Sequence, residues 1–585
     1  MFLRGRSVCS NKLPPLSCPV RPLRPFSSSS SAYNLLPSSP SPLSGTPSPF
    51  YITTPIFYVN AAPHIGHLHS MLLADVLARY ARLVQPNRRV IFSTGTDEHG
   101  LKIQNAAKDN KISPQQMCDA NSARFKALAS AANISYTTFI RTTEDRHKIA
   151  VQHMWKELLA RGHIYKGSHS GWYAVSDECF YTESQIQEGP DGNKVAIESG
   201  SKVEWSEEEN YKFRLSAFKE PLLKWLSENP EAMPLNEYRS NTMTYFEDLK
   251  DLSISRPSSR LTWGVPVPDD ENHTIYVWMD ALVNYLTVLG WPWKEGVNAE
   301  QMGWPADYQV VGKDIVRFHA VFWPAFLMAL SLPPPKSILV HAHWTQDQFK
   351  MSKSRGNVAD PFKAIESAGV DSVRAYLMGI GGSLADDSDY SYSALLMFHK
   401  LLSDQIGNLL NRFSGPKITN RLLDPSIPES QLTTSSSSNQ IQLEVLEGEE
   451  TIDKSLREIR EIVEKKLEKN EISSAIMEIL RVVAEANAFY SSHSPWASTT
   501  ATSSVERAYI YASNTLRITS ILLLPILPTK METLLDKMGV PKEERTWEAA
   551  AWTGKTEPGS VLAGRVDRAT KLMGKKVLFE RIVEV

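Results

Sequence analysis

Cysteine is scarce in this chain of 585 residues, which has only Cys9, Cys18, Cys118 and Cys179. These cysteines are widely separated, and none belongs to a CxxC pair, so the sequence offers neither a disulfide framework nor a thiolate pair for zinc. Such cysteine usage is typical of a protein that works in a reducing compartment.

Long apolar runs and net charge are also lacking. The longest apolar run, 321–332, contains Pro324 and is too short to cross a bilayer, so we expect a buried helix there and no membrane partner. The formal net charge of −2 provides no overall basic field. Any contact with nucleic acid must therefore come from local patches.

Acidic residues are missing from the N-terminal segment, and the first acid in the chain is Asp75. Residues 1–48 are basic and rich in serine and proline, and no apolar stretch follows the first arginines, which argues against a secretory signal. We expect a disordered transit peptide directed to the mitochondrial matrix, although the composition leaves a plastid address open. A disordered tail without an address is the alternative.

Beyond this segment the chain alternates strand and helix signals. The aromatic run 51–58 predicts a buried strand, a turn follows at 60–63, and apolar residues over 68–83 recur at helical spacing. A second strand over 90–93 leads through a glycine-containing turn into a helix from Leu101. This repetition predicts parallel crossovers and a doubly wound, Rossmann-like α/β fold with a site at the strand ends.

Two later regions differ from this alternation. Strands over 171–182 and 194–205, with a turn signal at 189–193, predict a β-rich insertion. The last third is predicted to be helical, with a flexible connection at 416–439. Further strands are expected over 252–256, 274–280, 308–314 and 338–343, and long helices over 392–413 and 449–490.

Two short motifs carry the chemistry. HIGH, residues 64–67, stands at a predicted helix N-terminus, whose unpaired N–H groups and partial positive charge suit a phosphate. Gly66 leaves room for a nucleotide against the backbone. KMSKS, residues 350–354, lies in a predicted polar loop. The chain, with HIGH early and KMSKS late, resembles the class I aminoacyl-tRNA synthetases.

The resemblance implies formation of an aminoacyl adenylate from ATP. Histidine side chains at the helix end can donate to phosphate, and lysines of KMSKS can neutralise the departing pyrophosphate. Mg²⁺ is expected with the ATP, held mainly by phosphates. We expect the catalytic residues to be His64, His67, Lys350 and Lys353. The ATP-binding residues are then His64, Gly66, His67, Gly312, Asp314, Lys350, Ser352 and Lys353.

Further stretches resemble the methionyl-tRNA synthetases in particular. They are TTPIFYVNAAPHIGH, TGTDEHG, YVWMDA, GKDIVRFHAVFWP and KMSKSRGNV, which span residues 53–358. The resemblance implies a methionine pocket of Ile56, Tyr58, Asp97, Arg256, Trp278, Ala281, Tyr285, Ile315 and His319. Aromatic walls suit a thioether, at about 0.3–1.5 kcal/mol per sulfur–aromatic contact.

Individual pocket residues have expected roles and simpler alternatives. Asp97 is expected to pair with the substrate ammonium, or else to cap a strand end. Arg256 is expected to pair with Asp97 or with the substrate carboxylate. His319 or Tyr58 can offer the sulfur a hydrogen bond. Trp278 and Tyr285, taken alone, are equally compatible with an ordinary aromatic core.

Anticodon recognition is expected in the helical region. GNLLNR, residues 407–412, and SPW, residues 494–496, resemble the positions that read the anticodon in this family. We expect Asn408, Arg412 and Trp496 to contact tRNA. Trp496 as a core residue is the alternative.

Two departures from the family pattern stand out. Relatives often carry metal-binding cysteines in the insertion, where this chain has only Cys179, so no structural zinc is expected. Relatives commonly have a glycine within 341–344, where this chain reads HAHW. The adenine contacts are therefore less well defined.

Other functions remain in competition. The insertion is too short for the editing domain of leucine, isoleucine or valine enzymes, and the cysteines that a cysteine enzyme needs are missing. A non-catalytic RNA-binding protein with this fold is the alternative from a different class. The intact motifs favour a methionine–tRNA ligase, expected to be a monomer, that uses L-methionine, ATP and tRNA(Met) for organellar protein synthesis.

The expected domains follow from the resemblance. They are a transit peptide (1–48), the first half of the catalytic domain (49–141), a connective-peptide insertion (142–250), the second half of the catalytic domain (251–345), the KMSKS loop and stem-contact region (346–391), a helical anticodon-binding domain (392–545) and a C-terminal tail (546–585).

Overall fold

The computed structural model describes residues 47–175, 179–189, 192–197, 199–346, 348–351, 357–426, 441–574 and 577–582. Residues 1–46 of the predicted transit segment lie outside these ranges, and so do Ser352 and Lys353 of KMSKS. Within the described ranges, no helix is long and apolar enough to cross a membrane.

A five-stranded sheet organises the N-terminal half. Its strands are β1 Phe50–Tyr58, β2 Val90–Asp97, β3 Thr138–Arg141, β13 Tyr308–Gly312 and β14 Ile338–His341. They lie in the order β14-β13-β1-β2-β3, and each neighbouring pair is parallel. The chain moves outward from β1 on one side and returns on the other, so a topological switch point lies at β1. The predicted doubly wound α/β fold is confirmed.

Helix α1 (Ile65–Val84) crosses from β1 to β2 and packs on β1, β2 and β13. Its first turn is closed by two histidines. The Gly66 N–H donates to His64 Nδ1 at 3.1 Å, and the His64 N–H donates to His67 Nδ1 at 3.1 Å. These bonds satisfy backbone donors that a helix N-terminus otherwise leaves unpaired. Helices α2 (Leu101–Asp109) and α3 (Pro114–Ala131) connect β2 to β3.

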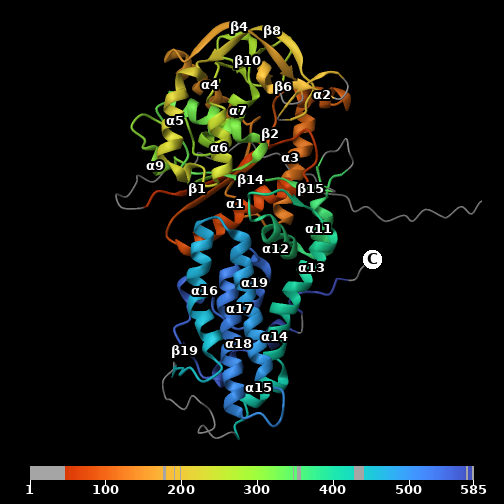
Figure 1. Ribbon diagram of the computed structural model, residues 1–585, viewed down its shortest axis with the longest axis vertical. Coiled ribbons are helices and arrows are strands. Elements are labelled where there is room, and N and C mark those ends of the chain that lie inside the picture. The colour runs from red at the N-terminus through yellow and green to blue at the C-terminus, as the bar shows by residue number, and fades with distance from the viewer. Residues whose placement is uncertain are drawn as a thin grey trace, which may run out of the picture. The chain divides into compact units, whose positions relative to one another are not determined.

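The insertion after β3 begins with α4 (Asp145–Ala160) and contains an antiparallel sheet. In the order β5-β4-β8-β9 this sheet has β4 Ile164–Ala174, β5 Cys179–Tyr181, β8 Glu204–Phe213 and β9 Leu252–Ser253. A ribbon of β6 (Ile186–Glu188) and β7 (Lys194–Ala196) and the helices α5 (Lys219–Glu228) and α6 (Asn236–Thr244) complete it. Figure 1 shows β4 and β8 side by side.

The strands expected in the insertion have wrong bounds. The run 171–182 divides into the end of β4 and β5, and the run 194–205 divides into β7 and the start of β8. Gly200, with a φ of +68°, lies at the reversal between β7 and β8. A left-handed residue of this kind allows the chain to turn where an uninterrupted strand was expected.

The second half of the catalytic region adds short elements. They are β10 Ser255–Pro257, β11 Pro266–Val267, β12 Asp270–Ile275, α7 Val277–Leu282, α8 Asn284–Thr287, α9 Ala299–Met302, α10 Trp323–Ala329, β15 Trp344–Gln346, β16 Phe349–Lys350 and β17 Ser388–Asp389. The strand expected over 274–280 is wrong beyond Ile275, because α7 begins at Val277. A short, mostly apolar run does not distinguish a buried strand from a buried helix.

The C-terminal part is helical. Its helices are α11 Pro361–Ala368, α12 Val370–Gly381, α13 Tyr392–Leu402, α14 Asn408–Phe413, α15 Pro416–Leu422, α16 Glu450–Glu468, α17 Ile472–Ser492, α18 Thr502–Leu523, α19 Pro528–Lys537 and α20 Gly559–Met573. Figure 1 shows α16, α17 and α18 running side by side. The helix expected over 449–490 is wrong as a single helix, since Asn470, with a φ of +60°, separates α16 from α17.

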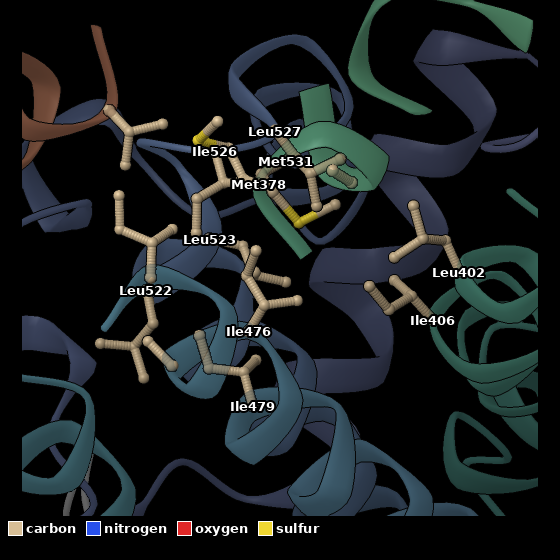
Figure 2. Close-up of a cluster of buried hydrophobic side chains, with 14 of the residues drawn as sticks. Met378, Leu402, Ile406, Ile476, Ile479, Leu522, Leu523, Ile526, Leu527 and Met531 are labelled. Atoms are coloured by element: carbon tan, nitrogen blue, oxygen red, sulfur yellow. The ribbon is translucent and has the colours of Figure 1, made fainter. Parts of the chain in front are cut away.

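An apolar core holds these helices together. Figure 2 shows side chains of α12, α17, α18 and α19 meeting in one cluster, with Leu402 of α13 and Ile406 beside them. The segment 546–574, expected as part of a tail, contains α20, which packs on α15, α18 and α19. The connection expected to be flexible over 416–439 begins with α15, and its residues from 427 lie outside the described ranges.

Candidate active site

A cavity of about 1330 Å³ opens at the carboxyl ends of the parallel strands. This edge of the sheet, beside a topological switch point, is where doubly wound folds bind ligands. The predicted residues that line it are Ile56, Tyr58, His64, Gly66, His67, Asp97, Trp278, Ala281, Tyr285, Gly312, Asp314, Ile315 and His319. Of Lys350 only the backbone, in β16, is described.

The two histidines of HIGH present N–H donors at this cavity. Because the Nδ1 atoms of His64 and His67 accept backbone N–H bonds, each neutral ring carries its proton on Nε2. Burial, followed by the neighbouring His64, holds the pKa of His67 well below its usual range, so this ring is neutral. The ring lies edge-on to Phe57 and Phe125, each at 5.2 Å.

Gly66 makes the close approach of His64 to the helix possible. A Cβ at Gly66 would lie 3.0 Å from His64 Cε1, which is tighter than ordinary van der Waals contact. Any larger residue would therefore push on the ring that caps α1.

The aromatic pocket lies on α7 and on the segment that follows β13. Trp278 stacks on Phe318 with ring centroids 3.6 Å apart and lies edge-on to His319 at 6.3 Å. Trp278 is half-buried and lines the cavity, whereas Tyr285 is buried. Phe318 was not among the predicted residues, although it stands in the GKDIVRFHAVFWP stretch.

His319 has its hydrogen-bonding capacity taken up within the protein. Its Nδ1 lies 2.9 Å from the Ile315 carbonyl and its Nε2 lies 2.7 Å from the Tyr285 hydroxyl. Burial lowers the pKa of His319 to about 4. A neutral ring facing a carbonyl must protonate Nδ1, so Nε2 accepts the tyrosine proton. This geometry leaves His319 no N–H for a substrate sulfur and so disfavours the expected donor.

A buried histidine–aspartate–histidine cluster supports the pocket helix. The two oxygens of Asp280, on α7, lie 2.6 Å from His99 Nδ1 and 2.8 Å from His147 Nε2. Burial alone would raise the pKa of Asp280, but the two histidines outweigh it and hold it at about 2. The cluster ties α7 to the loop after Asp97. Sequence reasoning missed these roles, although TGTDEHG and YVWMDA contain two of the residues.

Arg256 lies apart from the other predicted residues. It lines a separate small cavity and donates to Ser253 Oγ at 3.0 Å and to the Ser255 carbonyl at 2.8 Å. Its guanidinium lies 4.5 Å from the Tyr276 ring centroid. The pairing of Arg256 with Asp97 or with substrate stays a prediction.

Gly312, Asp314 and the HAHW residues line the same cavity. His343 Nε2 lies 3.2 Å from Asp314 Oδ1, and His341 Nε2 lies 2.8 Å from Ser70 Oγ. Within the ranges given above, no three His, Cys, Asp or Glu side chains are grouped so that they could hold a metal ion. The side chain of Cys179 is not among those described.

The predicted anticodon residues come together on the helical part. The Arg412 guanidinium lies 5.2 Å from the Trp496 ring centroid and 5.1 Å from that of Tyr490. Asn408 is exposed one helical turn before Arg412. Trp496 is 49% exposed, so the alternative that it is a core residue is wrong.

Known proteins identify the family. The family described as tRNA synthetases class I (M) matches residues 50–414. The probable mitochondrial methionine–tRNA ligase of Neurospora crassa is 45% identical over 513 residues, covering 86% of this chain and 81% of its own length. The human mitochondrial methionine–tRNA ligase is 42% identical over 508 residues, covering 85% of each.

A solved structure extends the likeness to the fold. The Mycobacterium tuberculosis methionyl-tRNA synthetase in complex with methionyl-adenylate superimposes with a TM-score of 0.80 at 33% identity, covering 91% of this chain and all of the other. These matches confirm the resemblance inferred from HIGH and KMSKS. The chain therefore belongs to the methionyl-tRNA synthetase family of class I aminoacyl-tRNA synthetases.

Proposed function

We propose that this chain activates L-methionine with ATP and then transfers the methionyl group to the 3′ end of tRNA(Met). The observation that carries the proposal is one cavity lined both by the neutral His67 at the N-terminus of α1 and by the aromatic pocket around Trp278. A donor set for phosphate thus adjoins a pocket for a thioether. The related mycobacterial enzyme binds methionyl-adenylate, the expected intermediate.

The signature residues are proposed to bind the nucleotide in this cavity. The Nε2–H groups of His64 and His67 donate to phosphate oxygens, and Lys353, with Lys350, neutralises the departing pyrophosphate. Gly312 and Asp314 face the ribose, and Ser352 assists at the phosphates. Mg²⁺ arrives with ATP and is held mainly by phosphate oxygens, as this small cation usually retains several waters.

The pocket residues are proposed to bind methionine in the same cavity. Asp97, buried at the end of β2, pairs with the substrate ammonium. Trp278 and Tyr285 provide aromatic walls beside Ile56, and Tyr58 is the remaining donor for sulfur, since His319 uses its own N–H internally. Ala281 and Ile315, which also line the cavity, complete the pocket wall.

The surface that recognises the anticodon is proposed to lie on the helical part, 392–545. A half-exposed Trp496 beside a guanidinium is a surface on which an unstacked base can lie. Asn408 bonds a base edge and Arg412 takes a base edge or a phosphate. The region 346–391 is proposed to meet the acceptor stem, and α20 to support the helices against which it packs.

The cellular site of action is proposed to be the mitochondrial matrix, with the chain acting as a monomer. The two related methionine–tRNA ligases given above are named mitochondrial, and residues 1–48 have the basic, acid-free composition of a transit peptide. A fluorescent reporter fused to residues 1–48 should enter mitochondria. A reporter that stays in the cytosol would contradict the address.

The proposed reaction is tested by ATP–pyrophosphate exchange with each standard amino acid in turn. We expect exchange with methionine and none above background with leucine, isoleucine, valine or cysteine. Exchange driven by another amino acid would reassign the substrate. No exchange with any of them, in protein that binds tRNA, would favour the non-catalytic alternative.

A further inference from the structure

A column of buried rings connects the HIGH helix to the strand pair that leads into KMSKS. It consists of His69 on α1, His341 at the end of β14, Trp344 at the start of β15 and Tyr376 on α12. His69 lies 4.9 Å from the His341 ring and 6.0 Å from the Trp344 ring, and Trp344 lies 5.5 Å from Tyr376. These side chains are 4% exposed or less, so the column is packed inside the protein.

Within this column His69 contacts the rings of both His341 and Trp344. It stands two residues after His67 and lines the cavity. Its Nε2 lies 3.2 Å from the Gly381 carbonyl at the end of α12. A ring nitrogen that faces a carbonyl carries the proton, so Nδ1 is left as an acceptor, and it is buried without a hydrogen-bond partner among the described residues. Such a group destabilises a fold, which indicates that something other than stability retains this histidine.

Gly381, at the end of α12, provides the space that the Trp344 indole occupies. A Cβ at Gly381 would lie 2.6 Å from Trp344 Nε1, so any side chain there would displace the indole. The absence of a side chain at Gly381 therefore lets the indole pack against the end of α12.

The column reaches the second signature motif through backbone pairing. β15 starts at Trp344 and pairs with β16, with Thr345 opposite Lys350. Lys350 is the first residue of KMSKS. The second anchor of this region is the bond between His341 Nε2 and Ser70 Oγ, next to His69 on α1. The HIGH helix thus contacts both ends of the segment 341–344.

We propose that His69 is a positioning residue for adenylate formation: through Trp344 and Gly381 it holds the strand pair that begins KMSKS in register with the HIGH helix. This inference rests on the proposed function. His69 touches neither substrate nor the reacting atoms in this account. It sets the distance between two groups that must act on the same ATP, where a misplacement of about 1 Å can cost about 100-fold in rate.

The test compares two substitutions at His69. An amide nitrogen of glutamine can take the place of Nε2 and donate to the Gly381 carbonyl, whereas leucine fills a similar volume without a donor. We expect His69→Gln to retain most of the methionine-dependent exchange and His69→Leu to lose about 10- to 100-fold in kcat. The KM for methionine should stay unchanged in both, because the aromatic pocket does not touch the column.

A stability-matched control separates positioning from simple loss of structure. Leu73, one turn further along α1 and fully buried, lies outside the column, so Leu73→Ala should lower the melting temperature with kcat preserved below it. Gly381→Ala should reproduce the kcat loss of His69→Leu with His69 still in place. If both variants behave in this way, the result supports disruption of the ring column, and not loss of stability, as the cause of the lower kcat.

The inference is overturned if His69→Leu keeps the wild-type kcat, if His69→Gln loses as much as His69→Leu, or if Gly381→Ala exchanges at the wild-type rate. A kcat that simply follows the melting temperature, as unfolding would produce, overturns it too. Wild-type protein without methionine-dependent exchange would instead contradict the proposed function, so the two failures are distinguishable.

Discussion

The two halves of the molecule place their functional groups in opposite environments. Around the catalytic cavity His319 and Asp280 are buried in the protein and His67 is half-buried, and a fixed donor or charge acts more strongly there than in water. In the helical part the buried cluster is apolar (Figure 2), and the candidate RNA contact Trp496 is 49% exposed. The difference follows from the partner: small substrates can be enclosed, whereas RNA bases must be met at a surface.

A buried ion pair joins these environments. Arg374, on α12, donates to Asp75 Oδ2 of the HIGH helix at 2.7 Å and to the carbonyls of Pro525 and Ile526 between α18 and α19. Both charged side chains are almost completely buried. Any substitution here should therefore affect both halves together, unlike the substitutions proposed for either site.

The largest effect is expected for Arg374→Met, which leaves Asp75 charged and buried. Removal of one partner of a buried pair costs about 3–5 kcal/mol, to be measured as the free energy of unfolding in urea. Arg79→Met is the matched control, because Arg79 is a more exposed partner of the same carboxylate at 2.8 Å and should cost about 0–1 kcal/mol. Equal losses in the two variants would show that burial does not set the strength of this contact.

A smaller but site-specific effect is expected for Lys353→Ala. Loss of one charge that acts on the departing pyrophosphate should lower the exchange kcat about 10²–10³-fold, since the contact forms mainly in the transition state. Methionine binding, measured by equilibrium titration, should stay near wild type. An unchanged exchange rate would remove Lys353 from the mechanism.

A still smaller effect is expected for Trp496→Ala. Stacking on a base contributes about 1–3 kcal/mol, so the tRNA KM should rise or the charging rate fall by about tenfold or more. Exchange and melting temperature should stay near wild type, because the ring is half-exposed. A large drop in melting temperature with equal losses in both activities would show that Trp496 is structural.

No effect is expected from removal of zinc. Among the described residues no grouping suits a metal ion, and the insertion has a single cysteine. Elemental analysis should find no stoichiometric zinc, and a zinc chelator should leave melting temperature and exchange unchanged. One zinc per chain would overturn the prediction.

Local patterns in the sequence predicted the catalytic half well. The strand before HIGH, the turn and the helix after it are close to β1 and α1, because apolar periodicity and turn residues are local signals. The prediction for the run 274–280 was wrong beyond Ile275, since a mostly apolar run fits either a strand or a helix. The roles of the two His319 nitrogens follow from their contacts with the Ile315 carbonyl and the Tyr285 hydroxyl. These contacts could be assigned only from the folded structure.

Long-range contacts were beyond the reach of local patterns. The pair Arg374–Asp75 joins residues 299 positions apart, and the sequence marks neither side chain as special. The column from His69 to Trp344 depends on the space at Gly381 in a third element. The packing of α20 was hidden because 546–585 carries no motif.

The most direct test of the account is the identity of the RNA that this chain charges with methionine. Purified protein should be incubated with ATP, labelled methionine and total organellar tRNA, and the charged RNA should be isolated and sequenced. The account predicts methionine on tRNA with a CAU anticodon and on no other tRNA. Methionine spread over tRNAs with unrelated anticodons, or no charging by protein that performs methionine-dependent exchange, would contradict it.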